Sequence, residues 1–232
     1  MSQELSLRLT KVKNFIPKDC KVIADIGSDH AYLPSMFCLE NPNAQAIAGE
    51  INEGPLLAAK NHVENFHLSH RIDCRLGSGL EVLKVNEAEC IVIAGMGGKL
   101  ITTILNEGIE KISNAKRLIL QPNIDAASIR QFAINHHFQI VEEEIFNEDG
   151  YIYEIIVLEP SLSQVVLTNK EIYLGPQLLK EKNSAFQQKW KRVAENKRRI
   201  IDQMQQAQSP DNEKINKFKQ HLYWIEEELI HG

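Results

Sequence analysis

The 232-residue sequence has few of the features that place a protein in a membrane, outside the cell or around a metal ion. No apolar run approaches the roughly 18 residues that span a bilayer. The N-terminal stretch carries Glu4 among spaced apolar residues, which is unlike a secretion signal. The four cysteines are far apart and lack CxxC spacing, and the scattered histidines give no ligand set. We therefore expect a cytoplasmic protein with free buried thiols and no metal.

The two parts of the chain differ in the sign of their charge, although the net charge of the whole is only −5. Residues 160–232 hold 12 Lys and Arg against 9 Asp and Glu, a balance of +3, which leaves 14 against 22, or −8, for the residues before them. Exposed charges more than about 10 Å apart are screened at moderate salt. The basic part can therefore bind a polyanion locally, or it can be an ordinary solvated helical surface.

The stretch KVIADIGSDHAYL (residues 21–33) organises the rest of the chain. Val22-Ile23-Ala24 predicts a buried parallel strand, followed by Asp25 and by Gly27 in a turn. Apolar spacing over residues 30–39 predicts a helix that tolerates Pro34 in its first turn. Strand, glycine turn and helix are typical of the first unit of a nucleotide-binding α/β fold, or of a plain βα turn.

Two further strands bring polar or flexible groups to the same edge of the predicted sheet. Residues 45–51 form the second strand and carry Glu50, 25 positions after Asp25, close to the offset of an acid that binds ribose hydroxyls. Residues 71–76 form the third strand, and Gly77-Ser78-Gly79 follows it. This turn admits an adenine ring against the backbone, or it is a plain loop.

The fourth and fifth strands end in unusual sequences. Residues 90–94 (CIVIA) form the most hydrophobic strand, which runs into Gly95-Met96-Gly97-Gly98. Three glycines in four positions carry an entropic cost, so we interpret them as room for a ligand. The strand over residues 117–120 is followed by Gln121-Pro122-Asn123, which places two amide side chains at the carboxyl edge.

Helices and a hairpin complete the first part of the chain. Apolar spacing predicts helices over residues 3–16, 55–66 and 99–105, and another that Asp125 caps. Arg8 falls off the apolar stripe of the first helix, so it is either solvated or faces a cleft. Two strands over residues 138–146 and 151–158, joined by Asn-Glu-Asp-Gly, predict a β-hairpin.

The pattern changes after Pro160, which predicts domains over residues 1–160 and 161–232. Apolar residues recur every seven positions at Leu179, Phe186, Val193, Ile200 and Ala207, and a second periodic segment follows Ser209-Pro210-Asp211. We expect an antiparallel coiled-coil hairpin of two helices. Its first helix carries six cations that contact phosphates or are merely solvated: Lys189, Lys191, Arg192, Lys197, Arg198 and Arg199.

Five strand–helix units followed by an antiparallel hairpin differ from the dinucleotide-binding pattern, which continues in parallel units. The order resembles the class I S-adenosylmethionine-dependent methyltransferase fold, a Rossmann-like seven-stranded sheet with an antiparallel last strand. Asp29 stands where the dinucleotide motif has its second glycine. A carboxylate there would repel a diphosphate but suits the ammonium of a methionine moiety.

The motifs ADIGSDHAYLP, GEIN, AGMGG and LQPN, together with the coiled coil, resemble the bacterial TrmK family of tRNA (adenine(22)-N(1))-methyltransferases. The resemblance implies methyl transfer from S-adenosyl-L-methionine to N1 of adenine 22 in tRNA. LGSGL departs from the more usual GDGL, which puts the contact of Ser78 with the adenine of the cofactor in question. Alternatives are a methyltransferase acting on another RNA or a protein, a nonenzymatic RNA-binding protein and, disfavoured by Asp29, an NAD oxidoreductase.

The resemblance also assigns roles to particular residues. Cofactor-binding candidates are Asp25, Gly27, Asp29, His30, Glu50, Ile51, Ser78, Gly79, Gly95, Met96 and Gly97. Candidates near the target base are Asp29, His30, Gln121 and Asn123, and substrate-binding candidates are Arg8, Tyr32, Lys197, Arg198 and Arg199. His30 is either a proton relay or a structural histidine. The Asn-Pro-Pro-Tyr motif of exocyclic-amine methyltransferases is absent, and attack by a ring nitrogen does not need it. We expect a monomer that flips the target base out of the tRNA.

Overall fold

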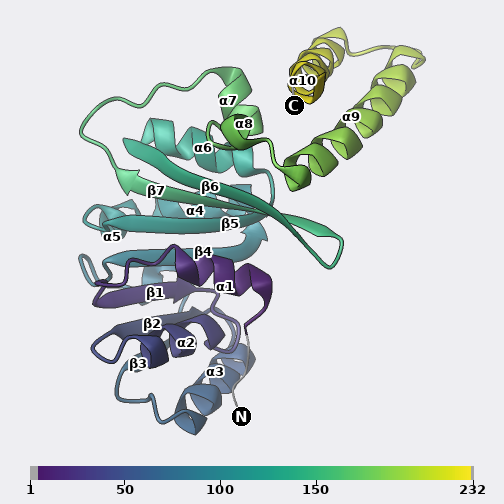
Figure 1. Cartoon of the computed structure of the whole chain (residues 1–232). Coiled ribbons are helices and arrows are strands. Elements are labelled where there is room, and N and C mark those ends of the chain that lie inside the picture. Colours follow the sequence, from purple (N-terminus) through teal and green to yellow (C-terminus); the bar gives the residue numbers. More distant parts are fainter. Residues whose placement is uncertain (1–4, 231–232) are drawn as a thin grey trace. The chain divides into compact units, whose positions relative to one another are not determined.

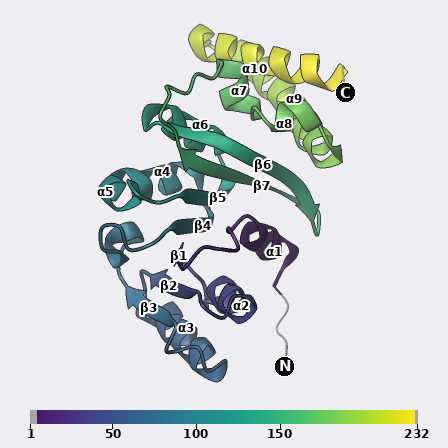
Figure 2. The ribbon, with the colours of Figure 1, turned by 60° about the vertical axis from the view of Figure 1, so that its left-hand side comes forward.

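The computed structural model describes residues 5–230, and its seven strands form one sheet in the order β3-β2-β1-β4-β5-β7-β6 (Figure 2). The strands are β1 (Val22–Ile26), β2 (Gln45–Glu50), β3 (Ile72–Leu76), β4 (Cys90–Gly97), β5 (Arg117–Ile124), β6 (Phe138–Glu148) and β7 (Tyr151–Pro160). The ladders from β3 to β5 are parallel, whereas β7 pairs antiparallel with β5. This topology confirms the predicted class I methyltransferase fold.

Helices cover both faces of the sheet, with α1, α2 and α3 on one face and α4, α5 and α6 on the other (Figure 1). They are α1 (Leu7–Asn14), α2 (Tyr32–Glu40), α3 (Glu53–Asn65), α4 (Gly98–Glu107), α5 (Ile109–Ile112) and α6 (Ala126–Asn135), with a short 3₁₀ helix η1 (Gly79–Val82). Because the central strands are covered on both faces, Ile23, Ile91 and Leu118 are completely buried. The hydrophobic core lies along β1, β4 and β5.

The first helix begins later than its apolar spacing predicts. Ser6 precedes α1, and its hydroxyl accepts a hydrogen bond from the backbone N–H of Leu9 at 3.2 Å. Residues 3 and 4, where the predicted helix starts, lie outside the described residues.

Two other predicted helix starts are wrong in detail. The helix predicted from residue 30 begins at Tyr32, because Asp29, His30 and Ala31 have left-handed backbones with φ of 43°, 67° and 55°. Asp125 precedes α6 but does not cap it in the usual way, since its own φ is 60°. Its carboxylate accepts a hydrogen bond from the Ser128 hydroxyl at 2.6 Å instead of from a backbone N–H.

The chain divides into two compact units. The first comprises the residues up to Glu142 together with Tyr153–Val165, and the second comprises Glu143–Ile152 together with the residues from Val166 onward. The tip of the β6–β7 hairpin thus belongs to the second unit. The domain boundary after residue 160 stays a prediction.

The second unit contains α7 (Asn169–Leu174), α8 (Leu178–Glu181), α9 (Ser184–Gln205) and α10 (Asn212–Ile230). Its core contains Phe186, Trp190 and Ile225, and α9 packs against α10. The heptad pattern misplaces Leu179 and Ala207. Leu179 lies in α8, which ends where Lys182 has a left-handed backbone, and Ala207 lies beyond the end of α9 and is exposed. The supercoil of a coiled coil stays a prediction.

The start of α10 follows the sequence closely. Asp211 caps it, because its Oδ1 accepts a hydrogen bond from the backbone N–H of Lys214 at 3.0 Å. No helix within residues 5–230 is long and apolar enough to cross a membrane.

Candidate functional site

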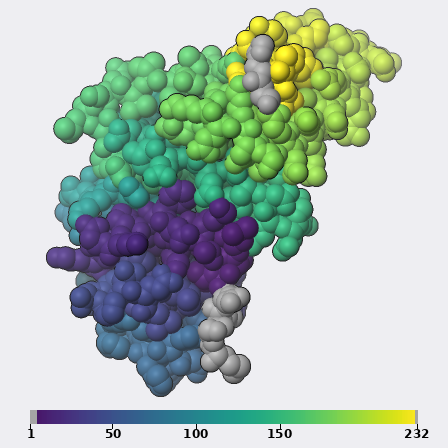
Figure 3. Space-filling view, viewed as in Figure 1, coloured from purple at the N-terminus to yellow at the C-terminus, as the bar shows by residue number. Residues whose placement is uncertain are grey.

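A cavity of about 320 Å³ opens in the first unit, where β1 and β4 end. Its lining comes from five segments far apart in the sequence. They are Arg8 and Leu9 of α1, the end of β1 and its turn with Asp25, Gly27, Ser28 and Asp29, the end of β4 with Ala94, Gly95 and Met96, Asn123 of β5 and Tyr153 of β7. Figure 3 shows α1 (purple) on the surface of this unit. Doubly wound sheets bind ligands at the carboxyl ends of their strands, so the cavity is the candidate site.

The turn after β1 is strained and is tied to the end of β2. Gly27 has φ of 70°, and the three left-handed residues from Asp29 to Ala31 follow it. A left-handed backbone costs a residue other than glycine roughly 1–2 kcal/mol. The Oε1 atom of Glu50 accepts a hydrogen bond from the backbone N–H of Asp29 at 2.6 Å, which holds the turn in this shape. Strain that the surroundings maintain is typical of a functional site.

Two carboxyl groups are buried beneath this turn. Asp25 is 4% exposed, and its Oδ2 accepts a hydrogen bond from the Ser28 hydroxyl at 2.6 Å. Burial raises the pKa of Asp25 to about 7, against the opposing effect of the Ser28 hydrogen bond. Burial also raises the pKa of Glu50, and the hydrogen bond from Asp29 opposes this shift. Asp25 lines the cavity, whereas Glu50 lies outside its lining. A buried acid at a cavity fits a cationic ligand, whose charge favours the ionised form of the acid.

A chain of side-chain amides links α1, β4 and β5. The Oε1 atom of Gln121 accepts hydrogen bonds from Arg8 Nη1 at 2.8 Å and from the backbone N–H of Gly95 at 3.0 Å. Gln121 Nε2 donates to Asn123 Oδ1 at 3.2 Å, and Asn123 Nδ2 donates to the carbonyl of Gly95 at 2.8 Å. Gln121 is completely buried, whereas Asn123 is exposed at the cavity. Gln121 therefore fixes its neighbours, and Asn123 can meet a ligand.

The reasons for glycine differ among the positions where β4 ends and α4 begins. Gly95 is exposed and has φ of 79°, a conformation that favours glycine. A Cβ atom at Gly97 would meet only the side chain of Ile124, at 3.6 Å. At Gly98 a Cβ atom would overlap the carbonyl oxygen of Asp125, so this glycine is explained by packing. The interpretation of all three glycines as room for a ligand is thus wrong for Gly98.

Several residues predicted for the site lie outside the cavity lining. Ile51 is 63% exposed just after β2, and Ser78 and Gly79 lie at the start of η1. His30 stacks on Tyr32 with ring centroids 5.3 Å apart, and Tyr32 also contacts His62 edge-on. Their roles stay predictions.

Four residues that line the cavity were not predicted from the sequence: Leu9, Ser28, Ala94 and Tyr153. Ser28 lies inside the motif of residues 21–33, and its place there was a signal for the site. Tyr153 could be found only from the antiparallel insertion of β7. The guanidinium of Arg8 lies 5.7 Å from the centre of its ring.

No cluster of three or more His, Cys, Asp and Glu side chains that could hold a metal ion exists within residues 5–230.

The order of the strands and the site at the ends of β1 and β4 place this fold in the class I S-adenosylmethionine-dependent methyltransferases.

Comparison with known proteins gives the family. The model of the TrmK family, tRNA (adenine(22)-N(1))-methyltransferase, matches residues 23–227. The tRNA (adenine(22)-N(1))-methyltransferase of Bacillus subtilis is 40% identical over 99% of this chain and 98% of its own length, and the B. subtilis TrmK crystal structure superposes with a TM-score of 0.91, covering 98% of this chain and 100% of that chain. The chain belongs to the TrmK family.

Some of the similar structures were solved with a ligand. Streptococcus pneumoniae Sp1610 in complex with S-adenosyl-L-methionine is 38% identical, with a TM-score of 0.86, over 97% of this chain and 100% of that one.

Proposed function

We propose that the protein transfers a methyl group from S-adenosyl-L-methionine to N1 of adenine 22 in tRNA. The observation that carries this proposal is the acid-bearing cavity at the ends of β1 and β4 in a chain of the TrmK family. The cofactor, when bound, supplies a methyl group already activated on a sulfonium. The protein's task is therefore to hold the two reactants in line.

The residues at the cavity fit such a cofactor. Gly27 and Gly95 have positive φ and leave the backbone accessible, while Asp25 and Asp29 place carboxyl groups on the lining. We assign the ammonium of the methionine moiety to Asp29, whose side chain is 85% exposed. Gly27, Gly95, Met96 and Gly97 border the path of the methyl group, and Asp25 supplies a buried negative charge. His30 adjoins the methionine end.

The other end of the cofactor is assigned to the turns after β2 and β3. One oxygen of Glu50 holds Asp29, and the carboxylate retains lone pairs for ribose hydroxyls. Ile51, exposed beside it, offers an apolar surface to the adenine ring, with Ser78 and Gly79 on the other side of the ring.

On the substrate side we assign Asn123 to the Watson–Crick edge of the target adenine. Its hydrogen bonds to Gln121 and Gly95 leave one N–H and one lone pair for the base. Gln121 is a positioning residue, because it is buried and holds Arg8 and Gly95. Attack of the N1 lone pair on the methyl carbon would break the carbon–sulfur bond and release S-adenosylhomocysteine. His30 is the candidate for accepting a proton from the exocyclic amine.

We assign the remaining RNA contacts to Arg8, Tyr32, Lys197 and Arg199. Arg198 was also a candidate, but its guanidinium pairs with Glu226 at 2.7 Å and is therefore a weaker choice. We further propose that the protein works in the cytoplasm, as a monomer and without a metal ion, since a sulfonium donor needs no metal to activate it.

The decisive experiment is incubation with methyl-labelled S-adenosylmethionine and an unmodified tRNA transcript, followed by mapping of the methylated nucleotide. We expect one N1-methyladenine at position 22, and no label in a matched transcript with guanine at that position. Equal labelling of both transcripts, or labelling of protein only, would contradict the assignment and favour another acceptor. No labelling together with no cofactor binding by calorimetry would favour a nonenzymatic RNA-binding protein.

A further inference from the structure

The second unit contains a larger cavity, of about 770 Å³, built entirely from its own helices. Aromatic and aliphatic side chains form its apolar part, and three cations, one carboxylate and one amide stand with them. The lining residues are Tyr173, Val193, Ile200, Phe218, Arg192, Lys197, Arg199, Glu195 and Asn196. The methyl-transfer reaction uses none of the apolar residues.

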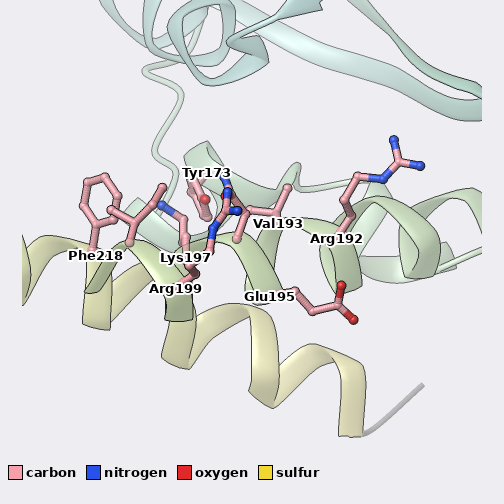
Figure 4. A pocket seen from close by; sticks show the side chains of 9 residues that line it. Tyr173, Arg192, Val193, Glu195, Lys197, Arg199 and Phe218 are labelled. Carbon is pink, nitrogen blue, oxygen red and sulfur yellow. The ribbon is translucent and has the colours of Figure 1, made fainter. Parts of the chain in front are cut away.

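Lys197 lies among the aromatic rings of this cavity (Figure 4). Its Nζ atom lies 4.1 Å from the ring centre of Phe218 and 5.6 Å from that of Tyr173. No carboxylate of residues 5–230 lies within ion-pair distance of it. Burial, and then the charge of Lys217, lower the pKa of Lys197. An anion in the cavity would compensate a cation that the protein leaves without a counter-ion.

A histidine outside the cavity lining packs against one of the aromatic rings. His221 stacks on Tyr173 with centroids 4.0 Å apart, and burial lowers the pKa of His221 to about 4. A flat apolar face beside a cation is the combination that binds a nucleotide, because bases stack on aromatic rings and phosphates pair with cations.

The surrounding charges favour the same ligand. Arg192 and Arg199 add two exposed cations at the cavity, against the single carboxylate of Glu195. Arg199 Nη2 donates a hydrogen bond to the uncharged amide oxygen of Asn196 at 2.8 Å, so the charge of Arg199 is not compensated there. Arg198, one residue away, is already paired with Glu226.

We propose that this cavity seats one unpaired nucleotide of the tRNA, with its base against Phe218 and Tyr173 and a phosphate at Lys197 and Arg199. The proposal rests on the proposed function for the identity of the RNA. It assigns the C-terminal unit a base-stacking contact with a single-stranded nucleotide, in addition to attraction of the RNA backbone.

The test compares tRNA binding by full-length variants over a range of salt concentrations. Phe218→Leu keeps an apolar side chain but removes the ring, so tRNA affinity should fall about tenfold with an unchanged salt dependence. Lys197→Met should weaken binding and reduce the slope of log affinity against log salt by about 0.7, the value for one contact to a single strand. The matched control, Lys219→Met, changes an exposed lysine of α10 outside the cavity lining and should leave the slope unchanged.

Cofactor affinity and melting temperature, measured on the same samples, should match those of the parent. Photocrosslinking of the parent protein to 4-thiouridine-substituted tRNA gives a readout that needs no variant, and the crosslinked peptides should contain Tyr173 or Phe218. Equal tRNA affinity of parent and Phe218→Leu, with crosslinks elsewhere, would overturn the nucleotide site alone. A parent that binds no tRNA would overturn the proposed function as well. If Phe218→Leu changed only the self-association of the protein in sedimentation and not its tRNA affinity, the nucleotide site would be overturned. The cavity would then be assigned to contact with a second copy of the chain.

Discussion

The Oε1 atom of Glu50 lies 2.6 Å from the backbone nitrogen of Asp29, although the two residues belong to different strand–helix units. The end of β2 therefore shapes the turn after β1, and under the proposed function the same carboxylate also binds the cofactor. This coupling makes Glu50 the most informative position for a first test.

Replacing Glu50 with Gln should weaken binding of S-adenosylmethionine about 10- to 100-fold, since a hydrogen bond to a charged group contributes about 1.5–3 kcal/mol. Calorimetric titration measures the loss. Glu53→Gln, which changes an exposed carboxylate in the first turn of α3, is the matched control and should bind as the parent does. Identical affinities for both variants would remove Glu50 from the site.

The pKa of Asp25 makes stability depend on pH. Because burial raises this pKa from 3.8 to about 7, the folded chain holds a proton that the unfolded chain has lost between these values. The contribution to the free energy of unfolding is complete below the unfolded pKa and is lost as the pH rises through about 7. Urea unfolding of the cofactor-free protein at pH 5 and 8 should show a smaller decrease for Asp25→Asn than for the parent. Equal decreases would contradict the raised pKa.

Two glycines should respond in opposite ways to alanine. At Gly98 the new methyl group would overlap the carbonyl of Asp125, and such overpacking costs about 1–3 kcal/mol or more. At Gly54, inside α3, a Cβ atom would meet nothing within 4 Å, so alanine should stabilise the protein by about 0.5–1 kcal/mol. Thermal melting should show a lower melting temperature for Gly98→Ala and a higher one for Gly54→Ala. A Gly98→Ala protein as stable as the parent would contradict the packing explanation.

A buried ion pair joins α6 to β7, between Arg130 Nη2 and Glu154 Oε2 at 2.8 Å. Arg130→Met removes the guanidinium that pairs with the buried Glu154 carboxylate, which should cost about 3–5 kcal/mol of stability. The double variant Arg130→Met with Glu154→Leu should recover most of this loss, because it removes both charges. Chemical denaturation measures all three proteins, and a double variant less stable than the single one would contradict the explanation.

The variant Gln121→Leu tests whether Gln121 positions Arg8 and Gly95 or binds the tRNA itself. The variant leaves Arg8 and the Gly95 N–H without their shared acceptor, so the rate at saturating tRNA should fall at least about tenfold. The KM for tRNA should change less than kcat, since the buried Gln121 side chain acts on the RNA only through Arg8. A variant with an unchanged kcat and a raised KM would assign Gln121 to substrate binding instead.

The succession of strands along the chain could be predicted from the sequence, because most of the parallel strands are short apolar runs that end in a polar or glycine-containing segment. The strand ends that carry Asp25, Gly95 and Asn123 were recognisable for the same reason, and the fold brings them to one cavity. The contact of Arg8 with Gln121 was not, since it joins side chains 113 positions apart. Periodicity also gave no sign of the left-handed residues at His30 and Lys182, where the path of the backbone, not side-chain polarity, sets the helix ends.

The assignment of the hairpin tip to the second unit has a consequence for dissecting the protein. Ile145 is 2% exposed and packs in one core with Phe186 and Trp190, although it belongs to a strand of the catalytic sheet. A truncation after residue 160 would remove the helices that bury this isoleucine. The shortened enzyme would then expose an apolar hairpin tip that promotes aggregation. Internal replacement of the β6–β7 tip by a short polar turn is therefore the sounder route to a separate methyltransferase domain.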